Sequence, residues 1–83
     1  MKKVVIYSTR ICPYCVRAKK FFDKKNITYT EIMIDQDPSL IAEMIEKSGR
    51  QSVPQIFIDD YHVGGFDDLI EHDMDGKLEG LLN

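Results

Sequence analysis

Short apolar runs alternate with amphipathic segments along the first half of the chain. The run 3–7 is β-branched and aromatic, which predicts a buried strand. From about Pro13, apolar residues recur at helical spacing with basic residues on the other side, so an amphipathic helix is predicted to about residue 25. The segment 27–34, "ITYTEIMI", predicts a second strand, which the turn-forming segment 35–38 closes.

The second half predicts a helix followed by a β-hairpin. Asp37 and Pro38 suit the N-cap and the first position of a helix, and Gly49 suits its C-terminal end. The segment 55–63, "QIFIDDYHV", predicts two short strands joined by a turn at its two aspartates.

Leucine and isoleucine residues after position 68 predict one or two closing helices, with Asp75 as a candidate N-cap and Gly76 as a break between them. A strand–helix–strand start implies a parallel pair with a right-handed crossover, to which the hairpin adds antiparallel strands. The predicted fold class is therefore α/β, a single domain over residues 1–83 with a central four-stranded mixed sheet and helices on both faces.

Composition narrows the classes of function. The 83 residues carry a net charge of −3, which gives no electrostatic reason to expect a nucleic acid. The apolar run 4–7 is too short for a signal-peptide core, and no stretch approaches the ~20 apolar residues of a membrane span. We therefore expect a cytoplasmic protein without membrane partners. The basic residues between Arg17 and Lys25 predict a solvated helix face, with docking of acidic partners as the alternative.

The two cysteines lie in "RICPYCVRAKKFF", at the predicted start of a helix. If Cys12 is the N-cap, the free amides of Tyr14 and Cys15 point at its sulfur, while Arg10 and Arg17 add positive potential. Such an environment stabilises a thiolate. Cys15, one turn further on, should be less exposed but within disulfide reach. Cys12 is therefore the predicted nucleophile and Cys15 the predicted resolving thiol.

Two other readings of this pair are less favoured. A zinc site needs four ligands, and only His62 and His72 could complete one; they stand ten residues apart, whereas such histidines are usually three to five residues apart. If the two cysteines were inert core residues, the basic residues around the start of the helix would have no explanation. We therefore expect no metal and assign no role to the histidines.

The motif Cys12-Pro13-Tyr14-Cys15 is followed, in order, by "SVPQIFID" and "HVGGFDDL". Over essentially its whole length the chain resembles the dithiol glutaredoxins. The resemblance implies a thioredoxin-like fold and a monomeric enzyme that reduces protein disulfides and protein–glutathione mixed disulfides. Its partners would be these proteins and glutathione, the electron donor, with no tightly bound cofactor.

The resemblance also assigns residues to the cysteinyl part of glutathione. We expect the bond before Pro54 to be cis, which would turn the Val53 backbone toward Cys12, where it can pair with this part of the tripeptide. Tyr14 is expected to flank the tripeptide, although packing on its own helix is the alternative.

The γ-glutamyl end is expected at "GGFDD". The free amides of Phe66 and Asp67 would hold its carboxylate, and the side chain of Asp67 or Asp68 would bind its ammonium group. Gly65 would let the backbone approach the tripeptide closely.

The glycine end of glutathione also needs a cation. Dithiol glutaredoxins commonly place a lysine three residues before the nucleophilic cysteine, but Thr9 stands there in this chain. Arg10 is the expected substitute, with Arg50 and Lys47 as further candidates.

Two competing functions would also use Cys12, the first with the same exchange chemistry and the second from a different class. A thioredoxin-like redoxin served by a flavoprotein reductase usually shows Trp-Cys-Gly-Pro-Cys, and this chain has no tryptophan, but glutaredoxin-like redoxins that use that reductase stay open as an alternative. An iron–sulfur carrier would bridge two subunits through Cys12 and glutathione, but such carriers generally have a single-cysteine motif, from which Pro13 departs.

Overall fold

The computed structural model describes residues 2–83. The predicted order of strand, helix, strand, helix, hairpin and closing helices is confirmed. The elements are β1 (Val4–Ser8), α1 (Pro13–Lys24), β2 (Thr30–Met33), a short 3₁₀ helix η1 (Ile34–Gln36), α2 (Pro38–Ser48), β3 (Gln55–Ile58), β4 (Tyr61–Gly64), α3 (Phe66–Met74) and α4 (Lys77–Leu82). Within these residues, no helix has both the length and the apolar character needed to cross a bilayer.

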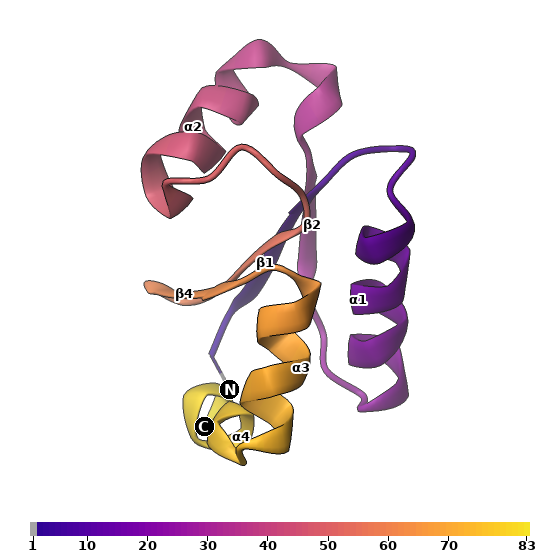
Figure 1. The fold of residues 1–83 in the computed structure, drawn as a ribbon, viewed down its shortest axis with the longest axis vertical. Helices are drawn as coiled ribbons and strands as arrows, with labels where there is room; N and C mark the ends of the chain where they lie inside the picture. Colours follow the sequence, from indigo (N-terminus) through magenta and orange to yellow (C-terminus); the bar gives the residue numbers. More distant parts are fainter. Residues whose placement is uncertain (1) are drawn as a thin grey trace.

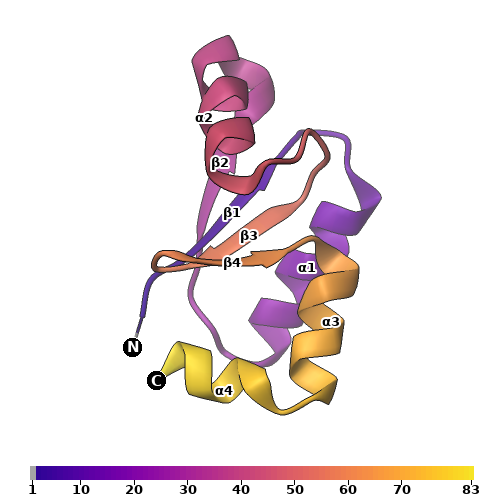
Figure 2. The ribbon, with the colours of Figure 1, turned by 60° about the vertical axis from the view of Figure 1, so that its left-hand side comes forward.

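The four strands form one mixed sheet in the order β2-β1-β3-β4. β1 pairs with β2 in parallel, and β3 pairs with β1 and with β4 in antiparallel fashion. Figures 1 and 2 show α1, α3 and α4 against one face of the sheet and α2 against the other. The predicted four-stranded mixed sheet with helices on both faces is therefore confirmed.

Alternation along the strands supplies one core for each face, because successive strand side chains point to opposite sides. On the α1 face, side chains at alternate positions of β1 and β3 pack with the helices; the buried set is Val4, Ile6, Ala18, Phe22, Ile27, Ile56, Ile58, Val63, Leu69, Leu78 and Leu82. On the α2 face, the smaller buried set is Tyr7, Ile34, Met44 and Phe57.

The register brings three chain segments to one end of the sheet. Tyr7 pairs with Gln55, so the C-terminal end of β1 lies beside the start of β3. Ile56 pairs with Gly64, which brings the end of β4 to the same place. The loop to α1, the loop before β3 and the start of α3 therefore meet at this end.

β2 is shorter than predicted. The expected strand began at residue 27, but the Ile27 N–H donates to the carbonyl of Phe22 at 2.9 Å and completes the turn after α1. Ile27 also packs in the α1-face core. Its backbone is therefore used to end the helix, and the ladder with β1 starts only at Thr30.

The predicted N-cap at Asp75 is wrong. Asp75 instead ends α3, where its N–H donates to the carbonyl of Glu71 at 3.0 Å. Gly76, with φ of +75°, is the residue that precedes α4. The predicted break at Gly76 is correct, since a left-handed backbone there suits glycine.

Tyr7 links β1 to α2. Its ring packs edge-on against Phe57, and its hydroxyl donates to Glu43 Oε2 at 2.7 Å. Burial of the phenol, together with this hydrogen bond to the carboxylate, raises the pKa of Tyr7 to about 12. The fold therefore favours the neutral form of this side chain.

We expect Tyr7→Phe to lower the free energy of unfolding at neutral pH by about 1 kcal/mol, because it removes a hydrogen bond to a partly exposed carboxylate. A raised pKa adds stability in full below the ordinary value of 10.0, and this stability is lost as pH rises through about 12. The wild type should therefore lose more stability than the variant above pH 10. Urea unfolding at several pH values measures this, and parallel profiles would contradict the assignment.

Candidate functional site

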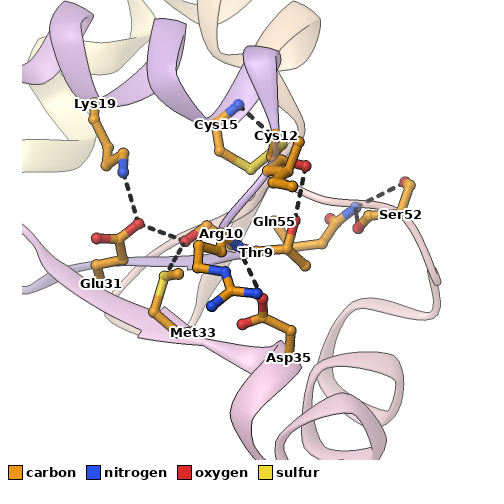
Figure 3. The surroundings of a disulfide bond; sticks show 12 residues. Thr9, Arg10, Cys12, Cys15, Lys19, Glu31, Met33, Asp35, Ser52 and Gln55 are labelled. Atoms are coloured by element: carbon orange, nitrogen blue, oxygen red, sulfur yellow. Dashed lines mark hydrogen bonds and ion pairs between the residues drawn. A yellow bond between two sulfur atoms is a disulfide. The ribbon is translucent and has the colours of Figure 1, made fainter.

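The cysteine pair begins α1. Cys12 is the N-cap with an extended backbone, Pro13 occupies the first helical position, and the Cys15 N–H donates to Cys12 Sγ at 3.1 Å. The two residues form a disulfide with their Cα atoms 5.2 Å apart (Figure 3). Cys12 is 8% exposed and Cys15 1%. Cys15 is therefore the less exposed of the two residues, as expected.

A polar cluster ties α1 to the sheet beside the cysteines. Ser8 is fully buried, and its hydroxyl donates to Glu31 Oε2 at 2.6 Å; Lys19 Nζ lies 2.8 Å from the same oxygen (Figure 3). Hydrogen bonds from Lys19 and then Ser8 lower the pKa of Glu31. The cluster joins β1, β2 and α1, and so fixes where the helix that carries the cysteines lies. Sequence reasoning missed it.

The loop before β3 has the expected geometry. The Val53–Pro54 peptide bond is cis, and Pro54 is buried. The β1–β3 register places this loop next to the chain that leads to Cys12. Among residues 2–83, the Val53 N–H has no hydrogen-bond acceptor. This donor is therefore available to a ligand.

The start of α3 offers further backbone donors. Gly65 is the N-cap, and a β-carbon there would lie 3.5 Å from the carbonyl oxygen of Pro54, so this turn touches the loop before β3. Within the described part of the chain, the amides of Phe66 and Asp67 have no acceptor, as is usual in a first helical turn. An anion placed here would meet two free N–H groups.

Asp68 holds this turn together. Its Oδ2 accepts from the Gly65 N–H at 2.8 Å and from Arg50 Nη1 at 2.9 Å. The Arg50 hydrogen bond and then the Gly65 backbone hydrogen bond lower the pKa of Asp68. Gly64 was not predicted to matter, yet its φ is +115° and a β-carbon on it would collide with the Asp68 side chain. A glycine is therefore required at residue 64.

Tyr14 joins the first turns of α1 and α3. Tyr14 is 53% exposed, its ring centroid lies 6.2 Å from that of Phe66, and the Arg17 guanidinium carbon lies over the ring, 5.2 Å from its centroid. The aromatic pair thus spans the space between the cysteine turn and the α3 amides. Both the flanking role and the packing role predicted for Tyr14 fit this position.

The segment before Cys12 presents one cation. The Thr9 hydroxyl donates to the Ile11 carbonyl at a long 3.4 Å. The Arg10 backbone N–H donates to Asp35 Oδ2 at 3.0 Å, which anchors the segment (Figure 3). The Arg10 residue is exposed, and its guanidinium makes no ion pair among residues 2–83.

The two other candidate cations are placed differently. Arg50 lies at the α3 end, paired with Asp68. Lys47 lines a cavity of about 220 Å³ together with Asp59 and Asp60, at the β3–β4 turn. That turn is the opposite end of β3 from Pro54, so the structure does not bring Lys47 to the site.

The histidines and the basic helix face have local partners. His72 Nε2 lies 2.8 Å from the Tyr61 hydroxyl, and His62 Nε2 lies 2.7 Å from Gln55 Oε1. In the part of the chain that the structure describes, no three His, Cys, Asp or Glu side chains gather as metal ligands. On the basic face, Lys25 pairs with Asp73 at 3.2 Å, so that face is not wholly free.

The arrangement suits thiol–disulfide exchange on an extended, anionic thiol ligand. The Cys12 sulfur, which accepts from a helix amide, lies at the same end of the sheet as the Val53, Phe66 and Asp67 N–H groups, which have no acceptor among residues 2–83. The attacking group would come from α1 and the binding groups from two loops.

Comparison with known proteins agrees with this description. Residues 4–63 match the Glutaredoxin family model. The chain is 48% identical over 83 residues to a glutaredoxin of Pseudomonas aeruginosa, covering 100% of this chain and 99% of the relative. It is 48% identical over 82 residues to glutaredoxin 3 of Escherichia coli, covering 99% of each protein.

Solved structures show the same fold. The crystal structure of a buckwheat glutaredoxin–glutathione complex superposes with a TM-score of 0.89 at 36% identity, covering 98% of this chain and 76% of that one. The solution structure of a glutaredoxin from Brucella melitensis gives 0.86 at 49% identity, covering 99% and 89%. The predicted thioredoxin-like fold is confirmed. With a family match over most of its length and a cysteine pair at the start of α1, this chain belongs to the glutaredoxin family of thiol–disulfide oxidoreductases.

Proposed function

We propose that this enzyme uses glutathione to reduce protein disulfides and protein–glutathione mixed disulfides through Cys12 and Cys15. The observation that carries the proposal is the hydrogen bond from the Cys15 N–H to Cys12 Sγ, at the end of the sheet where the Val53 amide has no partner within residues 2–83. We place the protein in the cytoplasm, since two cysteines in 83 residues suit a reducing compartment. We also propose that it acts as a monomer.

Glutathione would lie across three segments. The Val53 backbone would pair with its cysteinyl residue in the manner of an added strand. The free amides of Phe66 and Asp67 would hold the γ-glutamyl carboxylate. Asp68 would bind the ammonium group through Oδ1, which accepts no hydrogen bond among the described residues. The buckwheat relative was solved with glutathione, which supports this class of ligand.

With a protein–glutathione mixed disulfide, the Cys12 thiolate attacks the glutathione sulfur. The Cys12–glutathione bond forms, the old disulfide breaks, and the protein leaves as a thiolate that takes up a proton. A second glutathione thiolate then attacks the same sulfur of the bound glutathione. Cys12 leaves as a thiolate, and the two glutathione molecules leave joined by a disulfide bond, as oxidised glutathione.

With a protein disulfide, Cys12 first forms a mixed disulfide with one client sulfur and releases the other as a thiol. Cys15 then attacks Cys12 Sγ, which frees the client and leaves the Cys12–Cys15 disulfide seen in the structure. Two glutathione molecules reduce it, one forming a bond to Cys12 and the second removing it. Only this second route needs Cys15.

We expect Cys12→Ser to abolish both activities, because no other sulfur caps the helix. Cys15→Ser should keep deglutathionylation and lose reduction of protein disulfides. Glutathione-coupled assays on a glutathionylated peptide and on a protein disulfide measure the two routes. Equal loss of both activities in the two variants would refute this division of labour.

Arg10 is proposed to bind the glycine carboxylate. We expect Arg10→Ala to raise the KM for a glutathionylated peptide about threefold, the size typical of an exposed charge pair, with kcat little changed. Adding Thr9→Lys should restore KM, because a cation then stands at the position where the family commonly has one. A normal KM in Arg10→Ala, or no rescue by Thr9→Lys, would remove Arg10 from the site.

Asp68 and Asp67 can be separated as partners of the ammonium group. Asp68→Asn should raise KM and also lower stability at neutral pH. The pKa of Asp68 is lowered, so its contribution is full above the ordinary value of 3.8 and is lost as pH falls through the lower folded value. The stability difference from wild type should therefore shrink below pH 4 in urea unfolding.

Asp67→Asn is the matched variant one residue away, since the Asp67 side chain is exposed and makes no ion pair among residues 2–83. Its stability should stay at the wild-type value. If Asp67→Asn raised KM and Asp68→Asn did not, the ammonium group would belong to Asp67.

A further inference from the structure

Gln55 is a buried polar side chain next to the proposed glutathione site. It is the first residue of β3, follows Pro54 and has no exposed surface. A buried amide is costly unless its donors and acceptor are paired. Both ends of the Gln55 amide are paired: Nε2 donates to the Ser52 carbonyl at 3.0 Å, and Oε1 lies 2.7 Å from His62 Nε2. Figure 3 shows the amide pointing toward Ser52.

The Ser52 carbonyl sets the orientation of that amide, and His62 completes the pairing. The Ser52 carbonyl can only accept, so the Gln55 NH₂ group faces it and Oε1 faces the histidine. His62 Nε2 must therefore carry the hydrogen. The ring stacks on Phe57 with centroids 4.8 Å apart, and burial, with a smaller effect of Arg50, lowers the pKa of His62 and so favours the neutral ring. The hydrogen bonds thus run from His62 to Gln55 to Ser52.

The Ser52 carbonyl and the Val53 N–H belong to one peptide group. This peptide is planar and trans, so its C=O and N–H point in opposite directions. Drawing the carbonyl toward the Gln55 amide turns the Val53 N–H away from it. The β1–β3 ladder begins only at Gln55, so strand pairing does not hold this peptide.

We propose that Gln55 is a positioning residue for disulfide exchange: its buried amide, held between His62 and the Ser52 carbonyl, fixes the Ser52–Val53 peptide so that the Val53 N–H faces the cysteinyl carbonyl of bound glutathione. The inference deepens the proposed function and rests on it. A purely structural glutamine would affect folding stability alone, whereas a positioning glutamine also sets how well glutathione is held.

Gln55→Met tests this with a side chain of similar length that lacks both hydrogen bonds. We expect the KM for a glutathionylated peptide to rise about threefold to tenfold, the range for one hydrogen bond, with kcat within about twofold because Cys12 and its helix are untouched. A folded Gln55→Met with wild-type KM overturns the proposal.

Leu82→Ala is the control for lost stability. Leu82 is also buried, but it lies far from the site: its carbonyl accepts a hydrogen bond from the Lys2 N–H at the other end of the sheet. Its KM should equal that of the wild type even though its free energy of unfolding falls. If KM rose as stability fell in both variants, the role of Gln55 would be structural only, and the proposal would be wrong.

Gln55→Glu is the second variant. It keeps an oxygen for His62 but removes the NH₂ group that the Ser52 carbonyl needs, so it should raise KM as Gln55→Met does. If the KM of Gln55→Glu instead equals that of the wild type, the Ser52 hydrogen bond is not what positions Val53.

A measurement without glutathione separates this inference from the proposed function. Backbone ¹⁵N relaxation of the oxidised wild type should give Val53 an order parameter near 0.85, typical of rigid backbone, despite its free N–H. In the Gln55 variants it should fall toward 0.6 while Phe57 stays rigid. A flexible Val53 in the wild type overturns the inference directly. Failure of the wild type to turn over a glutathionylated peptide would instead count against the proposed function.

Discussion

The antiparallel pairing of β1 with β3 is the constraint on which the rest of the site depends. Because Tyr7 lies opposite Gln55, the chain leaves β1 toward Cys12 at the place where Pro54 enters β3. A slip of one residue would send Ile6 to the α2 face and Tyr7 into the α1-face core, since strand side chains alternate. The apolar pattern that builds the two cores therefore also sets which loops meet.

The groups that meet at this end are mostly backbone amides. The Cys15 N–H already donates to Cys12 Sγ, and the N–H groups of Val53, Phe66 and Asp67 lack acceptors within residues 2–83. Side chains contribute by holding these amides in place, as Asp68 does at Gly65. Under the proposed function, such a site would bind an extended peptide with charged ends through its backbone, and most of its specificity would lie in loop geometry.

This division explains what could be predicted from sequence. Cys12 at a helix N-cap, Gly49 at a helix end and the hairpin after Gln55 follow from local preferences, and all three are found. The Ser8–Glu31–Lys19 cluster was missed because its hydrogen-bonded partners stand 23 and 12 residues apart and each looks ordinary in its own element. Gln55 was missed for a similar reason: in "QIFID" it fits strand alternation, and only the fold shows that it is buried.

Two partly buried polar clusters add hydrogen bonds between segments that lie beside the site. One ties α1 to β1 and β2 through Glu31; the other ties the loop before β3 to β4 through Gln55 and His62. Apolar residues of the same shape are often as stabilising as a satisfied polar group, so stability alone gives little reason to keep either cluster. A hydrogen bond, however, fixes direction, which an apolar contact does not. In the proposed function, exchange between sulfurs needs the attacking sulfur and the tripeptide to be aligned, and we propose that these two clusters fix the direction on each side.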